Sequence, residues 1–512
     1  MKKLVTLLLA AGLVFASTTP ASAIDFKASG EWLFGFGVGD SNLVEKSRTA
    51  GGANNRSNAN DKFTAAQRIR LQLEAIASEN LSGTVRFEME STWGKTGGSG
   101  ALGADDQCIG VLNAYLDWAV PDTDLKFRMG VQPVELPSAA GGSSILNTDA
   151  LAGVTMSYQF NENVGATLFW GRPYNDNYAG NARRSNRDKN YLDNVDLIAL
   201  SVPLTFDGVN VTPWVMYGMV GENALRATND DNEYVGPTDM FAVNDVTGLN
   251  NLHITKAYGS AFWGGISTAI SAWDPLNIEL DLNYGYMEGM GSYDVTKVSA
   301  AGDEITKRAD LKREGFLAKA LVEYKMDWGT PGIFGWYGTG DDDNPKNGSE
   351  RMPAIEAKGN FTSMMGDDNF GWGSNSNWYD MTLNYAGTWG VGLQIKDMSF
   401  LENLSHTFRV AYWAGTNSPS MAKYAASPIS WNNQLDSSTS DSLYLTTNDS
   451  LLEFNLINKY QMYENFEINL ELGYMVNFFD HDTWKKSNSG RYGDTYENRD
   501  AWKAQLIFAY TF

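Results

Sequence analysis

The chain has 512 residues, a formal net charge of −22 and a single cysteine. The excess of acidic residues argues against a nucleic-acid partner, and one cysteine excludes an internal disulfide framework. No apolar run of about 18 residues, the minimum for a membrane-spanning helix, follows residue 23.

The first 23 residues have the layout of a secretory signal peptide. Two lysines follow the first methionine, residues 4–15 (LVTLLLAAGLVF) form a short apolar core, and Ala21-Ser22-Ala23 matches a cleavage site. We therefore expect residues 1–23 to be removed and the mature chain to begin at Ile24. No cysteine stands at the cleavage point, so a lipid-anchored form is not expected.

Segments in which apolar and polar residues alternate recur along the rest of the chain. In residues 466–479 every even position is apolar, whereas the odd positions include Glu467 and Glu471. A period of two is typical of a strand with one apolar and one polar face. We count eighteen such strands, and sixteen are possible because 191–203 and 257–271 alternate less regularly. The predicted strands are 26–38, 63–77, 83–93, 108–119, 125–132, 153–160, 163–171, 191–203, 209–219, 257–271, 277–288, 314–326, 331–338, 381–398, 404–415, 451–459, 466–479 and 500–512.

Short and long connections alternate between these strands. Tight turns, such as 121–124 and 401–403, alternate along the chain with long loops, such as 133–152 and 339–380. This is the wiring of an outer-membrane barrel, with short periplasmic turns and long outer loops. Unpaired backbone groups are costly in hydrocarbon, so the sheet must close on itself. The sequence therefore predicts an all-β transmembrane antiparallel barrel, residues 24–512, in which 26–38 pairs with 500–512.

Basic residues cluster on the polar face of neighbouring strands in the first third of the chain. An arginine or lysine facing lipid at mid-membrane costs about 2–4 kcal/mol, so these cations are expected to line water. They are Arg68, Arg70, Arg86, Lys126 and Arg128. The next connection, 133–152, is rich in small residues and carries Glu135 and Asp149. Acids on the same strands, among them Glu88 and Asp117, leave a second interpretation open, in which the wall is mainly a structural set of salt bridges.

The chain ends in Tyr510-Thr511-Phe512. With the signal peptide and the alternating connections, this ending resembles the trimeric porins of Gram-negative outer membranes. The stretch GIFGWYGTGDDDNPKNGSERMP at 332–353 is similar to the homotrimeric porins of sulfate-reducing bacteria. The resemblance implies a homotrimer in the cell outer membrane, with Tyr510 and Phe512 read by the barrel-assembly machinery.

In that family the third long loop folds into the barrel, so the resemblance places 133–152 inside the lumen. It implies that acids on this loop face the basic wall across a constriction, through which small polar solutes pass. Strands 26–38 and 63–77 would form the subunit interface.

Two transport functions are compatible with this sequence. The first is passive diffusion of small hydrophilic solutes and ions, and the second is a channel selective for sugars or small anions such as carboxylates. A sugar channel would need inward aromatics, for which the candidates are Phe169, Trp336 and Trp413. A barrel whose long loops seal the lumen would instead be a surface or adhesive protein.

Neither an enzyme nor a cofactor is expected. His253, His406 and His481 fall in no metal-ligand or protease spacing, and His406 is predicted on the lipid-facing side of its strand. The acidic run that includes Asp341 and Asp343 is a candidate calcium site in an outer loop, but its spacing does not match the EF-hand loop.

Overall fold

The computed structural model describes residues 24–40, 43–46, 62–94, 109–175, 194–226, 240–241, 252–298, 304–362, 385–425, 428, 443–485 and 496–512. The predicted signal peptide, residues 1–23, and Cys108 lie outside these residues. Within the described ranges, none of the helices has both the length and the apolar character needed to cross a membrane.

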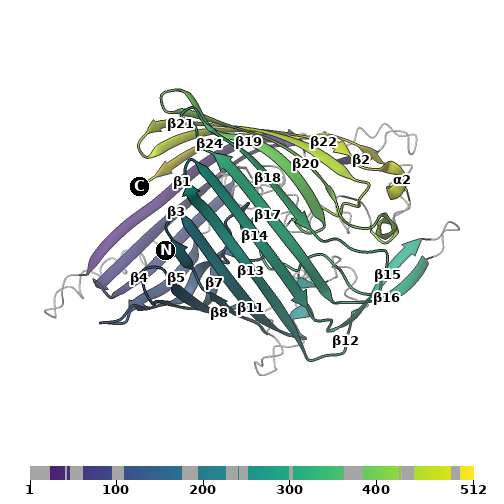
Figure 1. Cartoon of the computed structure of the whole chain (residues 1–512), viewed down its shortest axis with the longest axis horizontal. Helices are drawn as coiled ribbons and strands as arrows, with labels where there is room; N and C mark the ends of the chain where they lie inside the picture. Colours follow the sequence, from purple (N-terminus) through teal and green to yellow (C-terminus); the bar gives the residue numbers. More distant parts are fainter. Residues whose placement is uncertain are drawn as a thin grey trace.

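One antiparallel sheet of nineteen strands forms the body of the molecule (Figure 1). Both β9 and β10 pair with β11, and together they fill one place in the sheet, which gives eighteen strand positions. The predicted number of eighteen strands is confirmed. The strands are β1 (Asp25–Asp40), β3 (Lys62–Ser78), β4 (Leu81–Thr92), β5 (Gly110–Ala119), β6 (Leu125–Glu135), β7 (Asn147–Gln159), β8 (Gly165–Asn175), β9 (Asn194–Ser201), β10 (Leu204–Phe206), β11 (Val209–Gly221), β13 (Tyr258–Trp273), β14 (Leu276–Met287), β17 (Arg313–Tyr324), β18 (Thr330–Gly338), β19 (Thr388–Leu401), β20 (Leu404–Gly415), β21 (Ser450–Tyr463), β22 (Phe466–Phe478) and β24 (Ala501–Thr511).

The sheet closes between its first and last strands. β1 pairs with β3 on one side and with β24 on the other, and the register sets Trp32 opposite Tyr510 and Phe34 opposite Phe508. This confirms the predicted pairing of 26–38 with 500–512. Closure leaves no open edge, as a sheet in hydrocarbon requires.

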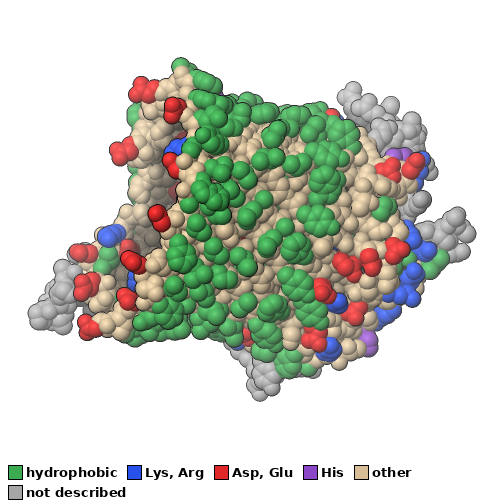
Figure 2. Space-filling model, in the orientation of Figure 1, with side chains coloured by type: hydrophobic (Ala, Val, Ile, Leu, Met, Phe, Trp, Pro, Cys, Tyr) green, Lys and Arg blue, Asp and Glu red, His purple; other side chains and the backbone are tan. Residues whose placement is uncertain are grey.

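On the barrel wall, apolar side chains face outward and charged side chains face inward, which is the reverse of a water-soluble protein. On β14, Leu282 is 50% exposed, whereas its neighbour Asp281 is 1% exposed. The same alternation appears on β22, where Leu472 is exposed and Glu471 is buried. Figure 2 shows hydrophobic side chains spread over the middle of the wall, with charged side chains towards its two ends. An exposed apolar band around a closed sheet is the surface expected against lipid.

Smaller elements lie at the end of the barrel opposite the chain termini (Figure 1). Residues of the long connections form a three-stranded sheet, a two-stranded sheet and short helical turns. These are β12 (His253–Ile254) with β15 (Gly291–Val298) and β16 (Glu304–Asp310), β2 (Val44–Lys46) with β23 (Tyr496–Asn498), η3 (Ala224–Arg226), η7 (Pro419–Lys423) and α2 (His481–Trp484).

An apolar core forms inside the barrel where the long connections meet inward-facing strand residues. Trp263 of β13 and Trp413 of β20 are fully buried in it, together with Met352 and Tyr444 from two connections. The Trp263 indole N–H donates to the carbonyl of Pro353 at 2.9 Å. Part of the lumen is therefore filled by packed protein.

Candidate pore constriction

The connection between β6 and β7 reaches across the interior. The two strands continue as a hairpin up to the pair Glu135–Asn147, and residues 136–146 form its tip. At this tip the backbone N–H groups of Ala139 and Ala140 donate to the Asp281 carboxylate at 3.0 and 2.9 Å. Asp281 belongs to β14, five places from β7 in the order β7-β8-β9-β11-β13-β14, so the segment spans the lumen.

A buried ion pair holds this tip against the far wall. Lys319 of β17 lies 3.3 Å from the Asp281 carboxylate, and its ammonium group also donates to the carbonyl of Gly142. Gly142 has a φ of +77°, and a Cβ there would lie 2.1 Å from the carbonyl oxygen of Lys358. Only glycine is compatible with this close approach.

A second connection lies beside the first. Ile355 donates its N–H to the carbonyl of Ile145 at 2.9 Å, and Lys358 donates to Ser143 at 2.8 Å. Residues 141–147 and 355–360 thus form a two-segment ribbon inside the barrel, which we call the lumen ribbon. The sequence did not predict that 351–362 would lie inside.

Three of the predicted site residues meet on the wall beside the ribbon. Arg70 of β3 donates to Glu88 of β4 at 2.6 Å and to Asp149 of β7 at 2.9 Å. The carboxylate of Glu31 on β1 lies 3.5–3.6 Å from the guanidinium groups of Arg70 and Arg86, and it lies at a similar distance from that of Arg68. Acids and bases of β1, β3 and β4 are therefore in contact on this wall. Glu31 is a member of this cluster that the sequence did not predict.

The remaining predicted cations lie on β6. Arg128 makes a two-pronged contact with Asp117 of β5 at 2.8 and 3.0 Å and stacks 4.3 Å above the ring of Tyr115. Lys126 is exposed two residues away on the same strand. Glu135, at the end of β6, lines a hollow of about 140 Å³ with Phe169 and Trp214. Its carboxylate interacts electrostatically with Lys358 and Lys319.

The three candidate aromatics for a sugar track face inward but are buried. Phe169, Trp336 and Trp413 all belong to the apolar core. Trp336 packs on Phe361 of the second connection, with ring centroids 5.9 Å apart. These three side chains therefore do not present their rings to water.

Asp341 acts as a clip between long connections. Its carboxylate accepts hydrogen bonds from the Ser349 hydroxyl at 2.6 Å, the Glu350 N–H at 3.0 Å and the Tyr444 hydroxyl at 2.7 Å. Burial, together with the nearby acids, raises the pKa of Glu350 to about 7. Asp343 is exposed. Within the ranges that the structure describes, no three His, Cys, Asp or Glu side chains are placed to hold a metal ion.

The three histidines lie on separate elements. His253 is in β12 and His481 begins α2. His406 is on β20 with its Nδ1 2.7 Å from the Asn458 amide oxygen of β21. His406 shares its side of the strand with the exposed Phe408, as the alternation predicted.

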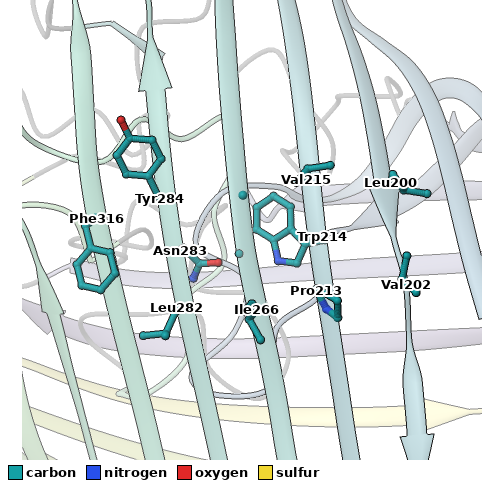
Figure 3. A pocket seen from close by; sticks show the side chains of 12 residues that line it. Leu200, Val202, Pro213, Trp214, Val215, Ile266, Leu282, Asn283, Tyr284 and Phe316 are labelled. Carbon is teal, nitrogen blue, oxygen red and sulfur yellow. The ribbon is translucent and has the colours of Figure 1, made fainter. Parts of the chain in front are cut away.

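A hollow of about 540 Å³ lies on the outer side of the wall, across β11, β13 and β14 (Figure 3). Its border is made by the exposed side chains of Val215, Ile266 and Leu282. Gly264, opposite Val215 in the register of β11 and β13, has no side chain to fill it. Because it faces outward, this hollow belongs to the lipid-facing surface and not to the lumen.

Neither a protein-family model nor a curated protein matches this sequence. Three crystal structures are similar to this protein over 95% of its chain: Pseudomonas aeruginosa OccK11 (OpdR), P. aeruginosa OpdQ and Acinetobacter baumannii OccAB3. Their sequence identities are 11%, 12% and 11%, and the matches cover 96%, 98% and 99% of their own chains. The TM-scores are 0.49, 0.48 and 0.48. At these values the likeness supports no statement about function. The barrel assignment rests on the strand register of the chain itself.

Proposed function

We propose that this protein is a porin: a water-filled channel in the outer membrane of a Gram-negative bacterium, through which small hydrophilic solutes and ions diffuse passively. The observation that carries the proposal is the closed eighteen-strand sheet with apolar residues outside and charged residues inside. A barrel of this circumference is too wide to be filled by wall side chains alone. The lipid bilayer is its first partner, and no catalytic role is proposed.

The two ends of the chain have features that would serve insertion into such a membrane. Phe512 donates its N–H to the Gly30 carbonyl at 3.1 Å and stacks on Tyr510, at the seam between β1 and β24. We propose that Tyr510 and Phe512 are read by the barrel-assembly machinery after residues 1–23 have been removed. A homotrimer, of the kind found in sulfate-reducing bacteria, is likewise a proposal, and heat-resistant oligomers on a gel would test it.

We propose that the constriction lies where the wall cations Arg70, Arg86 and Arg128 face the acids of the inward connection, chiefly Asp149. A channel selective for small anions is the alternative, favoured by the partial exposure of Arg86 and Arg128. Selectivity for sugars is less well supported, because the candidate aromatics are buried. We propose no cofactor and regard Asp341 as a loop clip, with no calcium bound there or at Asp343.

Recording from the purified protein in a planar bilayer tests the channel and its constriction together. Stepwise conductance increases are expected, because each inserted barrel adds one water-filled path. Under a salt gradient, Arg70→Gln, Arg86→Gln and Arg128→Gln are each expected to move the reversal potential towards the value for cations.

The two parts of this test fail separately. An absence of current steps from correctly folded protein would refute the channel. Normal steps with an unchanged reversal potential in all three variants would refute the constriction alone.

A further inference from the structure

We propose that the hollow lined by Glu135, Phe169 and Trp214 binds small quaternary ammonium ions as they pass through the lumen. The residues that line it include neither the wall cations nor Asp149, so this site is separate from the proposed constriction. The inference rests on the proposed channel function, because the water-filled lumen is the route by which such an ion reaches the hollow.

The hollow lies inside the barrel, where the inward connection leaves the wall. One side is formed by β7, β8, β9 and β11, and the other by residues 133–137 at the start of the connection. Leu136, Phe169 and Trp214 belong to the apolar core inside the barrel. Glu135 is exposed, which places it at the mouth of the hollow, towards the water of the lumen.

The size and the lining of the hollow limit what it can hold. Its volume of about 140 Å³ equals that of about five waters, so only a small solute fits. Phe169 and Trp214 are 5% and 3% exposed, and Pro133, Pro137 and Ala199 add further apolar surface. A bound metal cation such as calcium takes about six to eight oxygen ligands, which this mostly apolar lining does not offer.

The charge at the mouth selects for a cation. Among the described residues, none forms an ion pair with the Glu135 carboxylate, which interacts with Lys358 and Lys319 only at longer range. Each of these lysines has a closer acid of its own, since Lys319 lies 3.3 Å from Asp281 and Lys358 lies 3.8 Å from Asp149. The negative charge of Glu135 therefore attracts cations and repels anions.

The hydroxyl groups of the lining distinguish between two kinds of ammonium ion. Thr155 already donates to Gln132 at 2.8 Å, and Thr167 shares a hydrogen bond of 3.2 Å with Ser157. A primary ammonium has three N–H donors, which would lose their water without finding enough acceptors here. A quaternary ammonium has no N–H group, and its methyl groups can contact the apolar lining. Its charge is attracted by aromatic rings as well as by the carboxylate.

Titration calorimetry of the purified protein in detergent micelles tests the site, with choline chloride as the probe. A saturable heat is expected for choline and none for dimethylbutanol, its uncharged carbon isostere. Glu135→Gln is expected to raise the Kd for choline about tenfold or more, and Phe169→Leu about two- to fivefold. The matched control is Glu279→Gln, which removes a carboxylate of β14 and is expected to leave the Kd unchanged. Circular dichroism shows that each variant has folded.

The site and the channel fail separately in this design. Current steps in a planar bilayer from a protein that gives no saturable heat with choline would overturn the site and leave the channel intact. Equal binding of dimethylbutanol, or an unchanged Kd in Glu135→Gln, would also overturn the site. So would an equal rise of the Kd in Glu279→Gln, because it would mean general attraction to acids. Choline binding by a protein that forms no current steps would instead refute the proposed channel.

Discussion

Replacing Asp281 with asparagine is expected to lower the free energy of unfolding by about 3–5 kcal/mol, because the change leaves the Lys319 ammonium buried without the carboxylate that it pairs with. The same change weakens the acceptor that holds the N–H groups of Ala139 and Ala140. The tip of the inward connection is then released, and single-channel conductance is expected to rise. Thermal denaturation in detergent micelles and bilayer recording measure the two effects.

The matched control separates stability from loop anchoring. Glu471→Gln breaks an equally buried pair with Lys503, which joins wall strands β22 and β24. We expect it to be destabilising without raising the conductance. The double variant Asp281→Leu/Lys319→Met removes both charges, so it is expected to recover stability but to keep the raised conductance. Wild-type stability and conductance in Asp281→Asn would contradict this role of the pair.

Exchanging two neighbouring residues of β6 is expected to lower the free energy of unfolding by a comparable amount. The double variant Arg128→Met/Met129→Arg keeps the composition of the chain but moves a guanidinium group from the lumen face to the lipid face. An arginine in the lipid-facing band costs about 2–4 kcal/mol near the middle of the membrane. Reversible urea unfolding from lipid vesicles would measure the decrease in the free energy of unfolding.

Arg128→Met alone is the control for this exchange. It removes the partly exposed ion pair with Asp117, which contributes about 1 kcal/mol or less. A double variant no less stable than the single one would mean that Met129 does not face lipid.

Much of the fold could be predicted because a membrane barrel imposes one rule on every strand. Lipid on one side and polar groups on the other make the period of two visible along β22, where Leu472 and Glu471 alternate as predicted. Closure was also predictable, since an open edge is costly in hydrocarbon. The less regular segments still pair in register, because β9 and β13 each lie between two strands that fix them.

The site was predictable only where it consists of strand residues. Arg70 and Glu88 face one another because they share a rung of the ladder between β3 and β4. Glu31 joins them because β1 and β3 are consecutive strands of the barrel, and their register sets Glu31 opposite Arg70. Its place on the polar face of 26–38, the predicted strand next in the chain to 63–77, was therefore a usable signal.

The inward loop contacts could not be predicted, because no period relates a loop to the wall that it meets. Asp281 and the residues that it holds, Ala139 and Ala140, are far apart in sequence, and neither segment indicates the other. The aromatics show the same limit. Alternation places Trp336 on the inner face, but it does not reveal that Phe361 covers the ring.

Nitroxide spin labels at successive positions of β6 would test most directly whether the wall separates lipid from water. In a Cys108→Ser background, labels at positions 127, 129 and 131 are expected to collide mainly with oxygen, which concentrates in lipid. Labels at 126 and 128 are expected to collide mainly with a water-soluble nickel chelate. Alternation of this kind in lipid vesicles is the predicted result, and equal exposure of all five labels to the chelate would contradict it.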